Sequence, residues 1–328
     1  MPEIIALVLF ASLLLYALSG GADFGGGMWD LFARGRLGAA QRKLVERAIA
    51  PVWEANHVWL IVAVVLLFTA FPPAFAALAT RLHVPLTALL IGIVMRGSAL
   101  VFRQYGAPGS ARRWHRVFAV ASAVTPFFLG AVLGAVTSGD ASQTDLMAWL
   151  APLPIATGAA AVALCAYLAA VYLTVEATAS STDESAELTE NFRRRAIAAW
   201  IALAAAAAAS AAVARVHAPA FAARLFGSAW SEILVIAAAA AAIGALVALI
   251  RRRYRLARAL AVAQVVAVLG GWGAAHAPTI IAPDVTVQSS VAPPATLAVL
   301  APVLIGGAVL VLPALYWLLR VFKSRPLD

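Results

Sequence analysis

Apolar runs of about twenty residues recur from one end of the chain to the other, and they constrain the fold more than any other feature. Hydrophobic residues make up 63% of the 328 residues and charged residues only 12%, which lies outside the range of soluble proteins. A backbone in hydrocarbon must satisfy its own hydrogen bonds, and helices do so. We therefore predict an all-α polytopic membrane protein, in which residues 1–328 form a single integral membrane domain.

The runs predict about nine transmembrane helices. At two segments the sequence does not decide whether the helix continues, kinks or ends. Gly20–Gly27 either continues or breaks the first run. The Pro72-Pro73 pair either kinks the second run or ends it at Phe71. The first run begins near residue 4 and continues into the glycine-rich segment, and the others cover about 52–80, 83–104, 115–137, 149–176, 195–216, 229–250, 255–275 and 295–320.

Lysine and arginine are distributed unequally on the two sides of these runs. Of the 24 cations, 20 fall on the side of the first connecting loop, three (Arg81, Arg215 and Arg224) fall on the other side, and Arg96 lies inside a run. The positive-inside rule makes the first loop cytoplasmic, so we predict an outside N-terminus and a cytoplasmic C-terminus. Topology thus accounts for the net charge of +9, and nucleic acid is not expected as a partner.

Three ionisable residues, Asp23, Glu54 and Arg96, lie within or beside the apolar runs. With a rise of about 1.5 Å per helical residue, all three fall in the cytoplasmic half of the membrane. A charge in hydrocarbon costs at least about 2.5–3.5 kcal/mol, so residues of this kind are candidates for function.

Two interpretations of these residues are compatible with each other. Glu54 and His57 are three residues apart, so they share one face of a helix. An acid beside a group that titrates near neutrality can relay protons, which makes Glu54, Asp23 and His57 candidates for a proton path. In the structural interpretation, Arg96 instead neutralises Asp23 or Glu54 in a buried ion pair, and His57 is a satisfied partner.

The residue pattern does not support metal or haem ligation. Glu54-x-x-His57 matches one half of a di-iron motif, but no other histidine has an acid three residues before it. Cys165 is the single cysteine, so a disulfide framework and a cysteine-rich metal site are excluded. We predict no metal site and assign no cofactor to the chain from its residues. Trp53 and Trp59 are interpreted as interfacial or packing aromatics.

Two sequence blocks, Gly20–Asp30 and Ile49–Leu60, resemble in order and spacing subunit II of cytochrome bd-type quinol oxidases, in a short form. Met95–Gly97 adds to this likeness, whereas between about 180 and 260 it rests on length and hydropathy alone. His57 departs from the pattern, because other members can have a non-titrating amide there. The resemblance implies two four-helix bundles plus a peripheral helix, located in the bacterial cytoplasmic (inner) membrane.

The resemblance also implies partners and residue roles. In that family subunit I binds the haems and oxidises quinol, while subunit II is needed for assembly and stability. The proton-carrying acid of the family falls on Glu54, its aspartate on Asp23 and its arginine on Arg96. Trp59, with Trp53 nearby, falls near a suggested oxygen entry path of some members. The expected ligands and partners also include a structural quinone, which some members hold, a small accessory subunit and membrane lipids.

We therefore expect a non-haem subunit of a terminal oxidase complex that supplies proton access from the cytoplasm, packing and oxygen access. Quinol oxidation and oxygen reduction would be reactions of the complex. Two other classes stay open, a proton-coupled transporter with Asp23, Glu54 and Arg96 as its coupling site, and a purely structural membrane partner. Transporters of that kind tend to have repeated halves with interrupted helices near the midplane, whereas the interruptions here are confined to one end.

Overall fold

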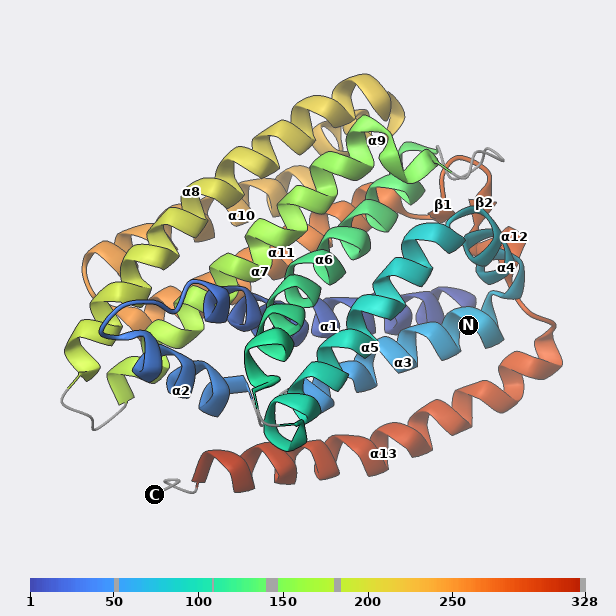
Figure 1. Ribbon diagram of the computed structural model, residues 1–328. Coiled ribbons are helices and arrows are strands. Elements are labelled where there is room, and N and C mark those ends of the chain that lie inside the picture. Colours follow the sequence, from blue (N-terminus) through green and yellow to red (C-terminus); the bar gives the residue numbers. More distant parts are fainter. Residues whose placement is uncertain (50–52, 108, 140–146, 180–183, 325–328) are drawn as a thin grey trace.

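Long apolar helices account for most of the described chain, as the recurring runs predict (Figure 1). The computed structural model describes residues 1–49, 53–107, 109–139, 147–179 and 184–324, apart from the side chains at 49, 53–55, 104, 318–319 and 321–324. The helices are α1 (Pro2–Leu31), α2 (Gly38–Ile49), α3 (Trp53–Ala70), α4 (Pro72–Arg81), α5 (His83–Tyr105), α6 (Ala111–Ser138), α7 (Pro152–Ala179), α8 (Ser185–His217), α9 (Pro219–Gly227), α10 (Ala229–Ile250), α11 (Tyr254–His276), α12 (Val287–Ser290) and α13 (Pro294–Ser324). A 3-10 turn, Ala148–Leu150, precedes α7.

The number of helices that can span a membrane agrees with the predicted nine. Within the described residues, eight helices are long and apolar enough to cross, and the bent pair of α3 and α4 makes nine if it counts as one span. The chain is therefore a multi-pass membrane protein of the all-α class.

The break between α3 and α4 lies at the predicted proline pair. α3 ends at Ala70, α4 begins at Pro72, and the two helices differ in direction by 114°. Proline lacks the N–H that would continue the helix, and its ring disfavours helical geometry in the preceding residue. Phe71 at the corner is buried, together with Ile5 of α1 and Leu66 of α3. The corner is thus a packed structural feature.

Three connections contain more structure than the sequence predicted. The basic segment after α1 forms the helix α2, because Leu44 and Val45 lie on one face and are buried against α7 and α8. The acidic segment before residue 195 is already helical, since α8 begins at Ser185. The loop before α13 contains a small antiparallel pair of strands, β1 (Thr279–Ile281) and β2 (Val285–Thr286), followed by α12.

Small residues bring α6 and α7 together at Gly130 and Gly134 of α6. A Cβ added at Gly130 would lie 2.5 Å from the carbonyl oxygen of Thr157, and one added at Gly134 would lie 2.6 Å from the Cα of Pro154. Only glycine leaves room for this approach. α7 also packs against α1, so it joins the N-terminal helices to α8 and α11.

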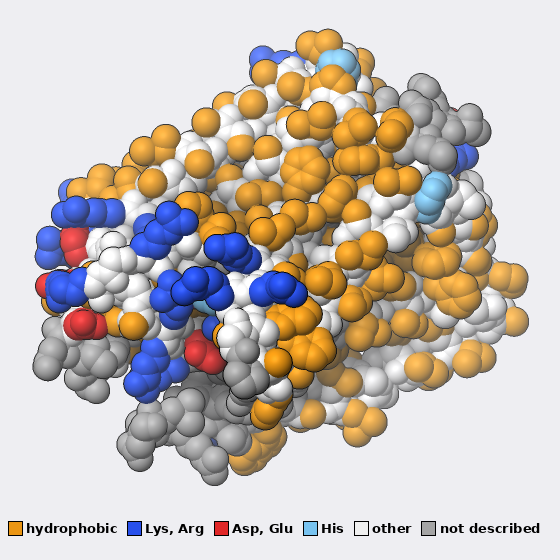
Figure 2. Space-filling view, in the orientation of Figure 1, with side chains coloured by type: hydrophobic (Ala, Val, Ile, Leu, Met, Phe, Trp, Pro, Cys, Tyr) orange, Lys and Arg blue, Asp and Glu red, His pale blue; other side chains and the backbone are white. Residues whose placement is uncertain are grey.

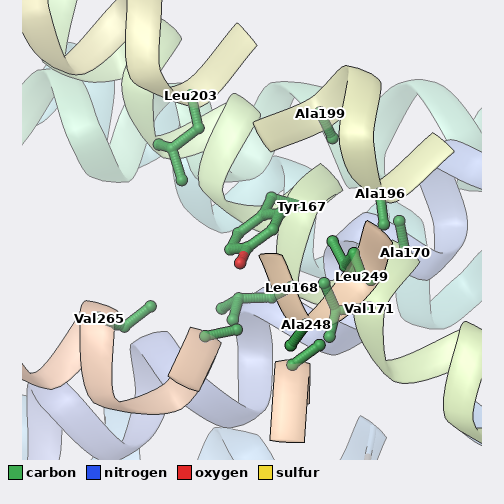
Figure 3. Packing of buried hydrophobic residues seen from close by; sticks show 12 residues of the cluster. Tyr167, Leu168, Ala170, Val171, Ala196, Ala199, Leu203, Ala248, Leu249 and Val265 are labelled. Atoms are coloured by element: carbon green, nitrogen blue, oxygen red, sulfur yellow. The ribbon is translucent and has the colours of Figure 1, made fainter. Parts of the chain in front are cut away.

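An apolar cluster forms the core between α7, α8, α10 and α11. Side chains from these four helices meet around Tyr167 and Leu168 of α7 (Figure 3). The remaining members are mostly alanine, with larger residues such as Leu203 of α8, Leu249 of α10 and Val265 of α11. Small side chains let the backbones approach, which fits the alanine-rich composition of this region.

Helix α13 runs along one side of the molecule, apart from most of the other helices (Figure 1). Between Pro294 and Trp317 its buried residue is Leu297, and the helix packs against α3. Basic side chains gather at one end of the molecule, while its flank is mostly apolar (Figure 2). This charge distribution agrees with the unequal placement of cations in the sequence. The division into two four-helix bundles with a peripheral helix stays a prediction.

Candidate functional site

The glycine-rich end of α1 positions the candidate site by letting two neighbouring helices approach. α1 continues without a break through Gly20–Gly27 to Leu31. A Cβ added at Gly25 would overlap the backbone carbonyl of Cys165 on α7, and one added at Gly27 would overlap the hydroxyl of Ser122 on α6. α1 therefore has glycines, which carry no Cβ atom, at the points where α6 and α7 pack against it. This close packing encloses the polar side chains of α1.

Asp23 and Arg96 form a buried ion pair between α1 and α5. Each residue is only 1% exposed. Arg96 Nη1 donates to Asp23 Oδ2 over 2.7 Å, and Arg96 Nη2 donates to the other carboxylate oxygen, Oδ1. Arg96 Nη2 also lies 3.2 Å from the backbone oxygen of Asp23, to which it donates as well. The planar guanidinium thus meets both carboxylate oxygens at once, the geometry that makes arginine suited to buried pairs.

Asn56 of α3 completes the contacts of this carboxylate. Its Nδ2 donates to Asp23 Oδ2 over 2.6 Å, and the residue is fully buried. Arg96 Nε donates to Ser122 Oγ of α6 over 3.0 Å. Side chains from α1, α3, α5 and α6 therefore converge on one point, and the negative charge of Asp23 is compensated by donors from two other helices.

Two aromatic rings enclose the guanidinium. The Cζ atom of Arg96 lies 4.8 Å from the ring centroid of Phe24 and 4.9 Å from that of Phe118. Cation–π contacts of this kind contribute about 2 kcal/mol when they are desolvated. They also exclude water from the pair, which strengthens its electrostatic attraction.

His57 and Trp59 lie beside this ion pair on α3. The His57 ring is partly buried, its centroid is 6.1 Å from that of Tyr16, and it lies within electrostatic range of Asp23 and Arg96. Trp59 packs against an apolar cluster that contains Tyr16 and Phe24. The side chains of Glu54 and Trp53 lie outside the described part of the chain, although both residues belong to the first turn of α3.

A second buried carboxylate, Asp30, belongs to the site and was missed by the sequence analysis. It is 1% exposed and lies near Arg103 and His115, which the sequence places at the basic connection between two runs. The signal that could have found it is spacing. Asp30 follows Asp23 by seven residues, as Arg103 follows Arg96.

Three of the five histidines lie against other side chains. His57 faces Tyr16, His115 contacts Asp30, and the ring of His276 stacks on that of Trp272 at 4.7 Å between centroids. Within the described residues, no three His, Cys, Asp or Glu side chains come together as a metal site would need.

Fold and site together define a class, that of polytopic helical membrane proteins with a buried acid–arginine pair. A family model described as cytochrome bd terminal oxidase subunit II matches residues 1–322. The chain belongs to this family.

Individual relatives align with parts of the chain. The cytochrome bd ubiquinol oxidase subunit 2 of Bacillus subtilis is 30% identical over 129 residues, which cover 38% of this chain and 37% of the relative. The cytochrome bd-I ubiquinol oxidase subunit 2 of Escherichia coli K12 is 29% identical over 134 residues, covering 40% of this chain and 34% of the relative. The chain thus aligns with little more than a third of the length of these curated relatives.

A solved structure shares the fold over the whole chain. The bd oxidase from Geobacillus thermodenitrificans matches with a TM-score of 0.77 and 22% sequence identity, covering 99% of both chains. The likeness concerns the path of the backbone, and it extends beyond the segments that the sequence alignments cover.

Proposed function

We propose that this chain is the non-haem subunit of a terminal quinol:oxygen oxidoreductase, in complex with a haem-bearing subunit I. The family match over residues 1–322 supports the assignment. The single observation that carries the functional argument is the buried contact between Asp23, Arg96 and Asn56. A buried ion pair adds little net stability over hydrophobic residues of similar volume, so its presence supports a role beyond filling space.

In this proposal the chain moves protons from the cytoplasm toward the partner's haem by way of Glu54, Asp23 and His57. Asn56 donates to Asp23 and follows Glu54 by two residues on α3, so the first turn of that helix is anchored at the ion pair. Arg96 and Asn56 hold the Asp23 carboxylate in a fixed position. His57, which lies next along α3, supplies a group that can gain and lose a proton near neutral pH.

The partners and location follow from the same proposal. In this proposal the haems belong to subunit I, as the family resemblance implies, and His57, His115 and His276 of this chain contact other side chains. Quinol is oxidised and oxygen is reduced to water by the complex, with Trp59 and Trp53 beside a route for oxygen. A structural quinone and a small accessory subunit are further expected components. The complex lies in the bacterial cytoplasmic membrane as one membrane domain, with the N-terminus outside and the basic end in Figure 2 facing the cytoplasm.

Co-purification tests the assignment to an oxidase. The chain is isolated from its native membrane under mild conditions, and the haem absorption spectrum of the preparation is recorded with quinol-dependent oxygen consumption. We expect a haem-bearing partner at equal stoichiometry. A preparation without haem protein would reject the oxidase assignment and favour the transporter or the purely structural alternative.

A charge-neutral substitution tests the proton path within the assembled complex. Glu54→Gln keeps the size of the side chain and removes its ability to carry a proton, so oxygen consumption is expected to slow while haem content is retained. Glu232→Gln, at an exposed position in the first turn of α10, is the matched control. Equal turnover of the two variants would remove Glu54 from the path.

A further inference from the structure

The acid–arginine pair of α1 and α5 repeats once along these helices, and each pair has a polar neighbour on α6. We call Asp23, Arg96 and Ser122 the upper layer, and Asp30, Arg103 and His115 the lower layer. On each helix the two members are seven residues apart. Seven residues are about two helical turns, or roughly 10.5 Å, so both members lie on the same helix face. The same three helices thus build an acid–arginine pair at two depths.

The lower layer differs from the upper layer in its access to solvent. The side chain of Asp30 is 1% exposed, whereas those of Arg103 and His115 are each 20% exposed. His115 Nε2 lies 3.0 Å from Asp30 Oδ2 but is not in hydrogen-bonding geometry, and Arg103 Nη1 lies 3.4 Å from the same oxygen. The buried carboxylate is therefore in contact with two side chains that reach solvent.

The other oxygen of this carboxylate is available for a further contact. Asp30 Oδ1 is buried and has no hydrogen-bond partner among the described residues. The remaining charged groups that act on Asp30 electrostatically are Arg42 and Glu46 of α2, and Arg42 also acts on His115. Orphaned carboxylate oxygens are rare in protein interiors, because desolvation without a hydrogen bond is costly. A proton or a water molecule at Oδ1 would satisfy this atom.

The chemistry of the two layers differs at one position. Ser122 on α6 in the upper layer corresponds to His115 in the lower layer, and only the histidine titrates near neutral pH. Both arginines keep their charge, so neither layer gains a proton from them. Phe118 lies between the layers, with the Cζ of Arg96 4.9 Å and that of Arg103 5.5 Å from its ring centroid. Its ring therefore contacts the arginines of both layers.

We propose that His115 and Asp30 form the cytoplasmic proton-loading pair of this subunit. The imidazole takes a proton at Nδ1 from a hydronium ion and, once the ring turns its Nε2–H bond toward the carboxylate, releases the proton on Nε2 to Asp30 Oδ2, which leaves water, a neutral imidazole and a neutral carboxylic acid. Asp30 then holds the proton that the path toward Asp23 takes up. This inference rests on the proposed function, since it gives the proton path toward Asp23 an entrance of its own.

The first test is the pH profile of the reconstituted, haem-loaded complex carrying His115→Gln. Glutamine keeps a polar side chain but cannot carry the proton. Wild-type turnover is expected to fall as the pH rises, because fewer protons are available to load the imidazole. His115→Gln is expected to be slower by about 10-fold or more at the acid end and to lose this pH step. His83→Gln, at an exposed position on α5, is the control.

The second test observes the carboxyl group directly. Infrared difference spectra between the oxidised and reduced complex should contain a carboxylic acid C=O band that shifts in Asp30→Glu, which keeps the acid but changes its stretching frequency. The proposal is overturned if His115→Gln leaves the pH profile unchanged and Asp30→Glu leaves the C=O band at its original frequency. If neither variant assembles with haem, the lower layer is structural and the proposal is also rejected. Should Glu54→Gln slow turnover while His115→Gln does not, only this entrance fails and the proposed function stands.

Discussion

The helices α1 and α5 differ from α7 to α11 in what they bury. The buried Asp, Glu, Lys and Arg residues in the described part of the chain are Asp23, Asp30 and Arg96, all on α1 and α5. The cluster between α7, α8, α10 and α11 consists of alanine and larger apolar residues around Tyr167. Directional contacts fix one arrangement of the first region, whereas small apolar contacts in the second can adjust. Substitutions should therefore be least tolerated around the charges.

Loss of the arginine should give the largest effect. Arg96→Ala leaves Asp23 buried without its main partner, which is expected to destabilise the subunit by about 3–5 kcal/mol. The yield of haem-loaded complex and its thermal denaturation measure the effect. Arg258→Ala on α11, whose side chain is 39% exposed, is the control and should behave as wild type.

A double variant decides whether the Arg96→Ala loss comes from the unpaired charge. Arg96→Met combined with Asp23→Leu removes both charges and keeps the volume, so much of the yield should return. Normal haem content in Arg96→Ala alone would contradict the view that this pair holds the region together.

Glycine substitutions test how closely the helices of the two regions pack. Gly25→Ala places a methyl group against the backbone carbonyl of Cys165, which cannot move like a side chain, so a loss of about 3 kcal/mol is expected. Gly270→Ala on α11 is the matched control, because its nearest neighbour, Leu234, would lie 3.6 Å away. Equal thermal stability of the two variants would show that α1 and α7 can separate at little cost.

The amide of Asn56 separates the role of hydrogen bonding from that of charge. Asn56→Ala removes one donor from the Asp23 carboxylate but leaves Arg96 in place, so a smaller loss of about 2 kcal/mol is expected. Thermal denaturation of the complex is again the measurement. Asn191→Ala, which removes a 3.2 Å hydrogen bond from Gln41 on another part of the molecule, should have a weaker effect. A reversed order of the two variants would show that Asn56 adds little to the site.

Much of the fold could be predicted because hydropathy and proline act locally. The break at Pro72 follows from the missing N–H of proline, and the membrane helices follow from their apolar length. α2 was predicted as a loop, since its apolar face is short and becomes meaningful only against α7 and α8. The local sequence pattern therefore predicts the membrane-spanning helices better than it predicts α2, the amphipathic helix between two of them.

The site was less predictable because partner choice is a tertiary property. The sequence offered both Asp23 and Glu54 as partners of Arg96, and only the packing of α1 against its neighbours places Asp23 in contact with the guanidinium. Asp30 was passed over because Arg103 and His115 lie near a basic connection, where charges are ordinarily solvated. The seven-residue repeat becomes informative once the three helices are known to be neighbours.

The smallest expected effect tests whether the apolar region also depends on a directional contact. Trp200 of α8 donates from Nε1 to the backbone oxygen of Ala242 on α10 over 2.9 Å. Trp200→Phe keeps most of the ring and removes the donor, and since the carbonyl can remain bonded within its own helix, a loss of only about 1 kcal/mol is expected. Trp230→Phe, at a residue that is 76% exposed, controls for loss of an indole. A loss at Trp200 as large as that of Arg96→Ala would remove the distinction between the two regions, because a single hydrogen bond would then hold α8 to α10 as firmly as an ion pair holds α1 to α5.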